Sequence, residues 1–184
     1  MSGTKSMSNI FVIVGGECSG KDEVIRAVYE LGGFHAQIIP KFTSRMRQAN
    51  DGREIRCNYL FEEQENKDVY VVKSQEDDQE YECDIVYIKN ENYYGIDSHK
   101  IWEGLRKNKF QVIVASEIEP INILKRKFGS LVKLIFIHAQ TEAEESPEFN
   151  LFINNFNAFD HVLIYESKKE DLYDQLFRLF RAYE

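Results

Sequence analysis

The stretch IFVIVGGECSGKDEVIRAVYEL, residues 10–31, decides the fold of this chain. It opens on a run of apolar, largely β-branched residues at 10–14, which is typical of a buried strand in a parallel sheet. A glycine-rich turn follows, and from Lys21 onward apolar residues recur at helical spacing. Strand, glycine loop and helix in this order predict an α/β fold with a phosphate-binding loop.

The loop matches the pattern G-x-x-x-x-G-K through Gly15, Gly20 and Lys21. Glycines let the backbone curl so that several amide N–H groups point at one anion, and the following helix adds partial positive charge. Lys21 is the first candidate catalytic residue, because a lysine at this position reaches the β- and γ-phosphates of a nucleoside triphosphate. We expect the phosphates of ATP to be bound by consecutive loop residues, namely Gly15, Gly16, Glu17, Cys18, Ser19, Gly20, Lys21 and Asp22.

Asp22 departs from the usual loop pattern, in which Ser or Thr places a hydroxyl on Mg²⁺. Two interpretations stand side by side. In one, the carboxylate ligates Mg²⁺ directly, since hard cations favour carboxylate oxygens. In the other, Asp22 only favours the helix dipole in the first turn.

Length, charge and cysteine content narrow the class of protein. With 184 residues, the chain suits one domain with a small insertion. A net charge of −8 without a long basic cluster argues against nucleic acid as a partner. No apolar run approaches the roughly 18 residues that span a bilayer, which argues against a membrane. Three scattered cysteines are typical of reduced thiols in a cytoplasmic protein.

Apolar periodicity extends the fold class to a three-layer P-loop NTPase fold with a central parallel sheet. We expect strands at 36–39, 110–115, 131–138 and 161–165, shorter β-like runs at 57–61, 69–74 and 83–89, and helices at 98–107, 120–128, 151–156 and from Ser167. Residues 139–148 are acidic and predict a loop. The predicted domains are a flexible start at 1–8, a core at 9–41 and 95–184, a small β-rich insertion at 42–94 and a short, acidic segment at 139–150.

The predicted insertion opens with KFTSRMRQANDGREIRCNYLF, residues 41–61. This segment contains the arginines Arg45, Arg47, Arg53 and Arg56. Arginine offers planar, bidentate donors that match phosphate, so two of them converging on one point would bind a phosphomonoester. The alternative is a solvated, charged surface arm. A later tyrosine, Tyr94, offers a hydroxyl as an additional phosphate donor.

The chain at this point resembles the guanylate kinase family. There a P-loop is followed by a TTR-type segment, a Gly-Glu stretch, a Tyr-Phe strand and an NYYG motif. Here residues 43–45, 51–54, 59–61 and 92–95 look like these four motifs, and the last matches letter for letter. The resemblance implies ATP-dependent phosphoryl transfer to GMP, dGMP or a ribose phosphate, with Mg²⁺. It also implies an acceptor phosphate held by Arg45, Tyr59, Tyr94 and one of Arg47, Arg53 and Arg56.

Some motifs differ from those of the family. Lys41 stands where the family has a guanine-contacting serine. The family's VLLDID strand corresponds to VIVASE at 112–117, in which Glu117 stands for the second of the two acids. The GKD of the loop and KFTSR at 41–45, which includes Ser44, resemble ribose 1,5-bisphosphate phosphokinases, a sister group on this fold. The candidate acceptor residues are therefore Lys41, Ser44, Arg45, Arg47, Arg53, Arg56, Tyr59, Tyr94 and Glu117.

The resemblance implies that the insertion at 42–94 binds the acceptor and that 139–150 is a reduced lid, which differs most from the family. Kinases of this kind bring arginines over the transferring phosphoryl group, and one such arginine is worth about 10³-fold or more in rate. Here no arginine occurs between Arg126 and Arg178. Either Arg45, the second candidate catalytic residue, or Lys133 substitutes, or a partner supplies the arginine, or catalysis is weak or absent. The alternative function is a catalytically degenerate nucleotide- or protein-binding module, with a protein as its partner.

Overall fold

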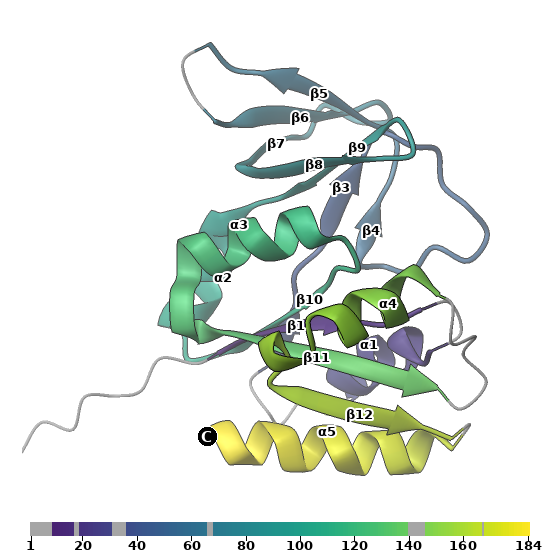
Figure 1. Ribbon diagram of the computed structural model, residues 1–184. Coiled ribbons are helices and arrows are strands. Elements are labelled where there is room, and N and C mark those ends of the chain that lie inside the picture. The colour runs from purple at the N-terminus through teal and green to yellow at the C-terminus, as the bar shows by residue number, and fades with distance from the viewer. Residues whose placement is uncertain (1–8, 17–18, 31–35, 66–67, 140–145, 167) are drawn as a thin grey trace, which may run out of the picture. The chain divides into compact units, whose positions relative to one another are not determined.

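The computed structural model describes the chain except for residues 1–8, 17–18, 31–35, 66–67, 140–145 and 167. The predicted flexible start at 1–8 lies outside the described residues. The chain forms two compact units (Figure 1). The first unit comprises residues 1–38 and 104–184, and the second unit comprises residues 39–103.

The first unit contains the predicted central sheet. Its five strands are all parallel and lie in the order β12, β11, β1, β10, β2. Their bounds are β1 Ile10–Val14, β2 Ala36–Ile38, β10 Phe110–Val114, β11 Val132–Ala139 and β12 His161–Tyr165. The strand β1 lies in the middle and is buried along its whole length, as its apolar sequence predicts.

Helices cover both faces of this sheet, so the α/β layering that the sequence predicts is confirmed. On one face, α1 (Lys21–Glu30) and α5 (Lys169–Tyr183) pack on Phe11, Ile135 and Ile137, and Figure 1 shows α5 running along β12. The opposite face carries α3 (Ile118–Phe128), η1 (Gly129–Leu131), α4 (Pro147–Asn154) and η2 (Phe156–Ala158).

The second unit is β-rich. A four-stranded sheet has the order β4, β3, β9, β8, and a three-stranded antiparallel sheet has the order β5, β6, β7. The bounds are β3 Lys41–Thr43, β4 Ile55–Arg56, β5 Tyr59–Glu63, β6 Tyr70–Ser74, β7 Glu80–Cys83, β8 Ile85–Lys89 and β9 Asn92–Ile96. The helix α2 (Ser98–Arg106) begins in the second unit, and its last residues belong to the first. Among the described residues, the helices are all too short or too polar to cross a lipid bilayer.

Several predicted boundaries are wrong, each for a local reason. Residues 83–89 form two strands, because Asp84 leaves the ladder to bind the backbone N–H and the hydroxyl of Ser98 at the start of α2. The helix expected from Pro120 begins at Ile118, since proline is tolerated throughout a first turn whose N–H groups lack helical partners.

The predicted loop at 139–148 is wrong at both ends. Ala139 is the last residue of β11, and α4 already begins at Pro147. Ser146 starts this helix, because its hydroxyl oxygen accepts a hydrogen bond of 3.0 Å from the Phe149 N–H. A helix thus begins within the predicted lid at 139–150. The sequence predicts that this helix begins only at Leu151.

Candidate functional site

The phosphate loop lies between β1 and α1, where two glycines allow close contacts. At Gly15 a Cβ would lie 2.5 Å from the Ser19 hydroxyl oxygen. Gly20 has a positive φ of 94°, and a Cβ there would lie 2.9 Å from ring atoms of Tyr165. A side chain at Gly20 would therefore be strained, and a side chain at Gly15 would collide with the buried side chain of Ser19. The expected loop residues Glu17 and Cys18 lie outside the described residues.

Two polar side chains gather at the loop. Lys21 donates hydrogen bonds from Nζ to the carbonyl oxygens of Gly15 and Gly16, which brings its positive charge back over the loop. The Ser19 side chain is almost fully buried, and its hydroxyl lacks a hydrogen-bond partner among the described residues. Because buried polar groups are normally paired, a phosphate oxygen is a suitable partner for this hydroxyl. The loop thus fits the phosphates of ATP.

Carboxylates flank the loop at the carboxyl edge of the sheet. Asp22 is exposed in the first turn of α1. The strand β10 lies next to β1, and Ser116 and Glu117 follow its end. The Ser116 hydroxyl donates to the Gly15 carbonyl at 3.4 Å, and Glu117 is the N-cap residue of α3. Within the described ranges no three metal-binding side chains cluster. The donor set fits Mg²⁺, because this ion takes only one or two protein carboxylates and completes its shell with phosphate and water.

In the second unit, the structure brings together two of the predicted acceptor residues. The Arg45 Nε donates to the Tyr94 hydroxyl at 3.3 Å. Asp51 completes the cluster, because its carboxylate accepts from both terminal nitrogens of Arg45, at 2.5 and 2.8 Å. Reasoning from the sequence missed this pair. Its only signal is the turn-forming run Ala49-Asn50-Asp51-Gly52, which brings the chain back toward the end of β3.

Arg56 and Tyr59 lie in a different cluster of the second unit. The Arg56 guanidinium stacks over the rings of Phe42 and Tyr81, at 5.4 and 5.5 Å from their centroids. The Lys100 ammonium lies 4.9 Å from the Tyr81 centroid. Tyr59 packs edge-on against Phe42, and burial raises the pKa of its hydroxyl. This cluster packs cations on aromatic faces.

The remaining predicted acceptor residues have separate surroundings. The Ser44 hydroxyl accepts a hydrogen bond of 2.9 Å from the Tyr93 N–H, which ties it to β9. Lys41 is largely buried, Arg47 donates to the Ile55 carbonyl at 3.4 Å, and Arg53 is exposed. Glu117 belongs to the first unit, whereas the others belong to the second.

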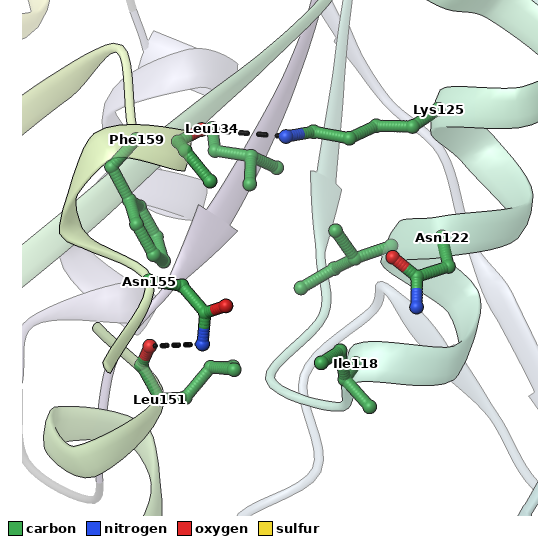
Figure 2. Close-up of a pocket in the computed structure, with 9 residues that line it drawn as sticks. Ile118, Asn122, Lys125, Leu134, Leu151, Asn155 and Phe159 are labelled. Carbon is green, nitrogen blue, oxygen red and sulfur yellow. Dashed lines mark hydrogen bonds between the residues drawn. The ribbon is translucent and has the colours of Figure 1, made fainter. Parts of the chain in front are cut away.

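A small, mostly apolar pocket lies between α3 and the α4–η2 segment (Figure 2). Its volume is about 60 Å³, which is far too small for a nucleotide. Figure 2 shows Lys125 reaching across it to bind the Ala158 carbonyl, at 3.3 Å. On the other side, Asn155 closes the end of α4 by donating to the Leu151 carbonyl at 2.9 Å. The pocket is therefore a packing gap between helices that are held together across it.

No family model matches the sequence, and no curated protein matches it either. The fold, however, is similar to solved structures. One of them is the crystal structure of guanylate kinase from Anaplasma phagocytophilum, with a TM-score of 0.64 and 13% sequence identity. The match covers 97% of this chain and 87% of the other. At this identity, the likeness establishes that the chain has a fold like that of guanylate kinase.

Proposed function

We propose that this protein is an ATP-dependent phosphotransferase that acts on a small phosphorylated acceptor, such as GMP, dGMP or a ribose phosphate. The observation that carries the proposal is the hydrogen bond between Arg45 and Tyr94 in a chain that also has a phosphate loop. Such a chain has candidate donors for the phosphates of two substrates. The overall likeness to a guanylate kinase structure supports the same reading. The proposed setting is the cytoplasm.

On the ATP side, we assign the phosphates to the loop amides, the Ser19 hydroxyl and Lys21. The Lys21 ammonium would leave the carbonyls of Gly15 and Gly16 and neutralise charge on the β- and γ-phosphates. Asp22 or Glu117 would hold Mg²⁺. The ion would supply neutralisation of the charge that develops on the transferring phosphoryl group.

On the acceptor side, we assign the phosphate to Arg45 and Tyr94. The Tyr94 hydroxyl oxygen already accepts from Arg45, so its hydrogen remains to donate to a phosphate oxygen. Tyr59 and one of Arg47, Arg53 and Arg56 are the further candidates, and Lys41 and Ser44 would contact the remainder of the acceptor.

One observation favours a second function, a binding module that holds a nucleotide or a protein without phosphoryl transfer. The helix α4 lies where a lid is predicted, and its Phe152 is buried against Phe136 of the sheet. Because no arginine occurs between Arg126 and Arg178 in the sequence, this helix has no guanidinium to offer for the transfer step.

Paired binding and turnover measurements test the proposal. ATP with Mg²⁺ should raise the melting temperature, and ADP should be released in the presence of GMP, dGMP, AMP or ribose 1,5-bisphosphate. Lys21→Ala should abolish both signals, whereas the exposed Lys107→Ala should leave both unchanged. Binding without turnover on any acceptor at high enzyme concentration would favour a nucleotide-binding module. No ATP binding would contradict the kinase, and together with a co-purifying protein partner it would favour a protein-binding module.

A further inference from the structure

The guanidinium of Arg45 is almost fully engaged within the second unit. Arginine has five N–H donors. Four of the five form hydrogen bonds in Arg45. One donates to the Tyr94 hydroxyl, one to the Met46 carbonyl at 3.0 Å, and two to the oxygens of Asp51 at 2.5 and 2.8 Å. The bidentate side of the guanidinium, which would match a phosphate, therefore faces the Asp51 carboxylate.

Asp51 is held in place from several directions. Its Oδ2 also accepts a hydrogen bond of 2.7 Å from the Gln48 N–H and one of 3.4 Å from the Cys57 thiol. Only 6% of the Asp51 side chain and 17% of the Arg45 side chain are exposed. The hydrogen bonds to Arg45 hold the pKa of Asp51 well below its ordinary value, so the carboxylate stays ionised at neutral pH. Asp51 thus resembles a bound anion supplied by the chain itself.

Little donor capacity remains for an acceptor phosphate in this arrangement. After these four hydrogen bonds, one N–H of the Arg45 Nη2 and the hydroxyl hydrogen of Tyr94 are the donors that remain in this cluster. A phosphate dianion that approached them would also lie next to the negative charge of Asp51. Bidentate binding to Arg45 would therefore require Asp51 to move away.

We propose that Asp51 is a specificity-determining residue of the acceptor site, which competes with the acceptor's phosphate for Arg45 and so weakens the binding of dianionic acceptors. This inference rests on the proposed acceptor role of Arg45 and Tyr94. Its consequence is that removing the charge of Asp51, while keeping its shape, frees Arg45 for phosphate. Asparagine does this, because its amide oxygen still accepts one hydrogen bond.

Titration calorimetry with GMP, and separately with inorganic phosphate, tests the inference at neutral pH. Asp51→Asn should bind each anion at least tenfold more tightly than the wild type. Asp78→Asn, an exposed charge removal in the same unit, should bind as the wild type does. Adding Arg45→Gln to Asp51→Asn should remove the gain. A gain that persists without Arg45 would overturn the inference, because it would reflect the general loss of negative charge.

A second variant covers the case in which Asp51→Asn does not fold. Cys57→Ala keeps the carboxylate but removes one of its donors, and it should tighten GMP binding about twofold to threefold as Asp51 becomes easier to displace. If the folded Asp51→Asn binds no more tightly, or if no variant binds either anion, the inference is wrong. Because the readout is binding, it separates the two proposals. If Asp51→Asn binds the anions more tightly but the protein shows no turnover, only the proposed kinase activity is wrong. If the protein shows turnover but Asp51→Asn binds as the wild type does, only the proposed role of Asp51 is wrong.

Discussion

The phenyl ring of Phe152 in α4 stacks on that of Phe136 in β11, with ring centroids 4.3 Å apart and planes inclined by 5°. Phe136 is fully buried, and Phe152 is 8% exposed. Phe159 packs edge-on against both rings, with centroids 6.0 and 5.2 Å away. A helix that begins inside the predicted lid is therefore fixed to the central sheet through its aromatic side chains.

Phe152→Ala is expected to lower the free energy of unfolding by about 3 kcal/mol, because it removes a buried ring and leaves a cavity against Phe136. Phe156 belongs to the same segment but is 61% exposed. Phe156→Ala should therefore cost less than about 1 kcal/mol. Urea unfolding of both variants checks this. Equal losses would mean that α4 is not anchored by Phe152.

The first unit could largely be predicted from the sequence because its signals are local. The apolar run of β1 and the glycines before Lys21 each determine their own element through backbone and burial requirements. The strand β12 has the predicted bounds for the same reason, although α4 begins earlier than its apolar pattern indicates. The cap by Ser146 explains that difference, since a single side-chain hydrogen bond extends the helix into polar sequence.

The candidate acceptor site could be predicted only in part. A family motif draws attention to Arg45 and Tyr94, and the structure brings these residues together. No sequence pattern links Asp51 to Arg45, because their ion pair depends on how the turn between them folds back. The same holds for Tyr165, which approaches Gly20 from the far end of the chain. Contacts between residues distant in sequence follow from packing, which local patterns do not encode.

Gly20→Ala is expected to reduce both stability and the thermal shift that ATP produces. The substitution places a Cβ at positive φ and within 2.9 Å of the Tyr165 ring. Backbone strain of this kind costs about 1–3 kcal/mol. Gly129→Ala is the matched control, because Gly129 also has a positive φ, 56°, but a Cβ there meets no atom within 4 Å.

The two glycines should differ in their coupling to Tyr165. Tyr165→Ala should recover part of the stability lost in Gly20→Ala, because it removes the clash, and should recover none in Gly129→Ala. A double-mutant cycle by thermal unfolding measures both couplings. Zero coupling between Gly20 and Tyr165 would contradict the close approach.

The ion pair of Arg45 and Asp51 should make stability depend on pH in acid. Hydrogen bonds to Arg45 lower the pKa of Asp51 from its ordinary value of 3.8 in the folded protein. The stabilisation is therefore fully present above pH 3.8 and is lost as the pH falls toward the lower folded pKa. At neutral pH, the free energy of unfolding of Asp51→Asn should be about 2 kcal/mol lower than that of the wild type, since the variant loses a charge-assisted hydrogen bond.

Urea unfolding from neutral pH down to about pH 3 checks this expectation. The difference between the wild type and Asp51→Asn should stay constant down to about pH 4 and then shrink, because Asp51 takes up a proton in the unfolded chain while the folded pair keeps its carboxylate ionised. The exposed variant Asp78→Asn should follow the wild type throughout. A difference that does not change with pH would show that the stabilisation does not depend on the charge of Asp51.

Asp22 is expected to act through Mg²⁺ rather than through the helix dipole, and its neighbour Glu23 separates the two effects. Both carboxylates lie in the first turn of α1, so each favours the helix dipole to a similar degree. Glu23, however, forms an ion pair of 2.8 Å with Arg26 along the helix. Only Asp22 directly follows Lys21, at the position from which the usual loop hydroxyl reaches the metal.

Asp22→Asn should therefore remove most of the additional thermal shift that Mg²⁺ gives on top of ATP alone, while Glu23→Gln should keep it. Without ligand, each variant should lose a dipole interaction worth about 0.3–1 kcal/mol, and Glu23→Gln should lose in addition the exposed ion pair with Arg26, worth less than about 1 kcal/mol. Thermal unfolding with ATP, in the presence of Mg²⁺ or of a chelator, measures the two quantities separately. Equal Mg²⁺ dependence in the two variants would leave Asp22 with the dipole role alone and would shift the metal to Glu117.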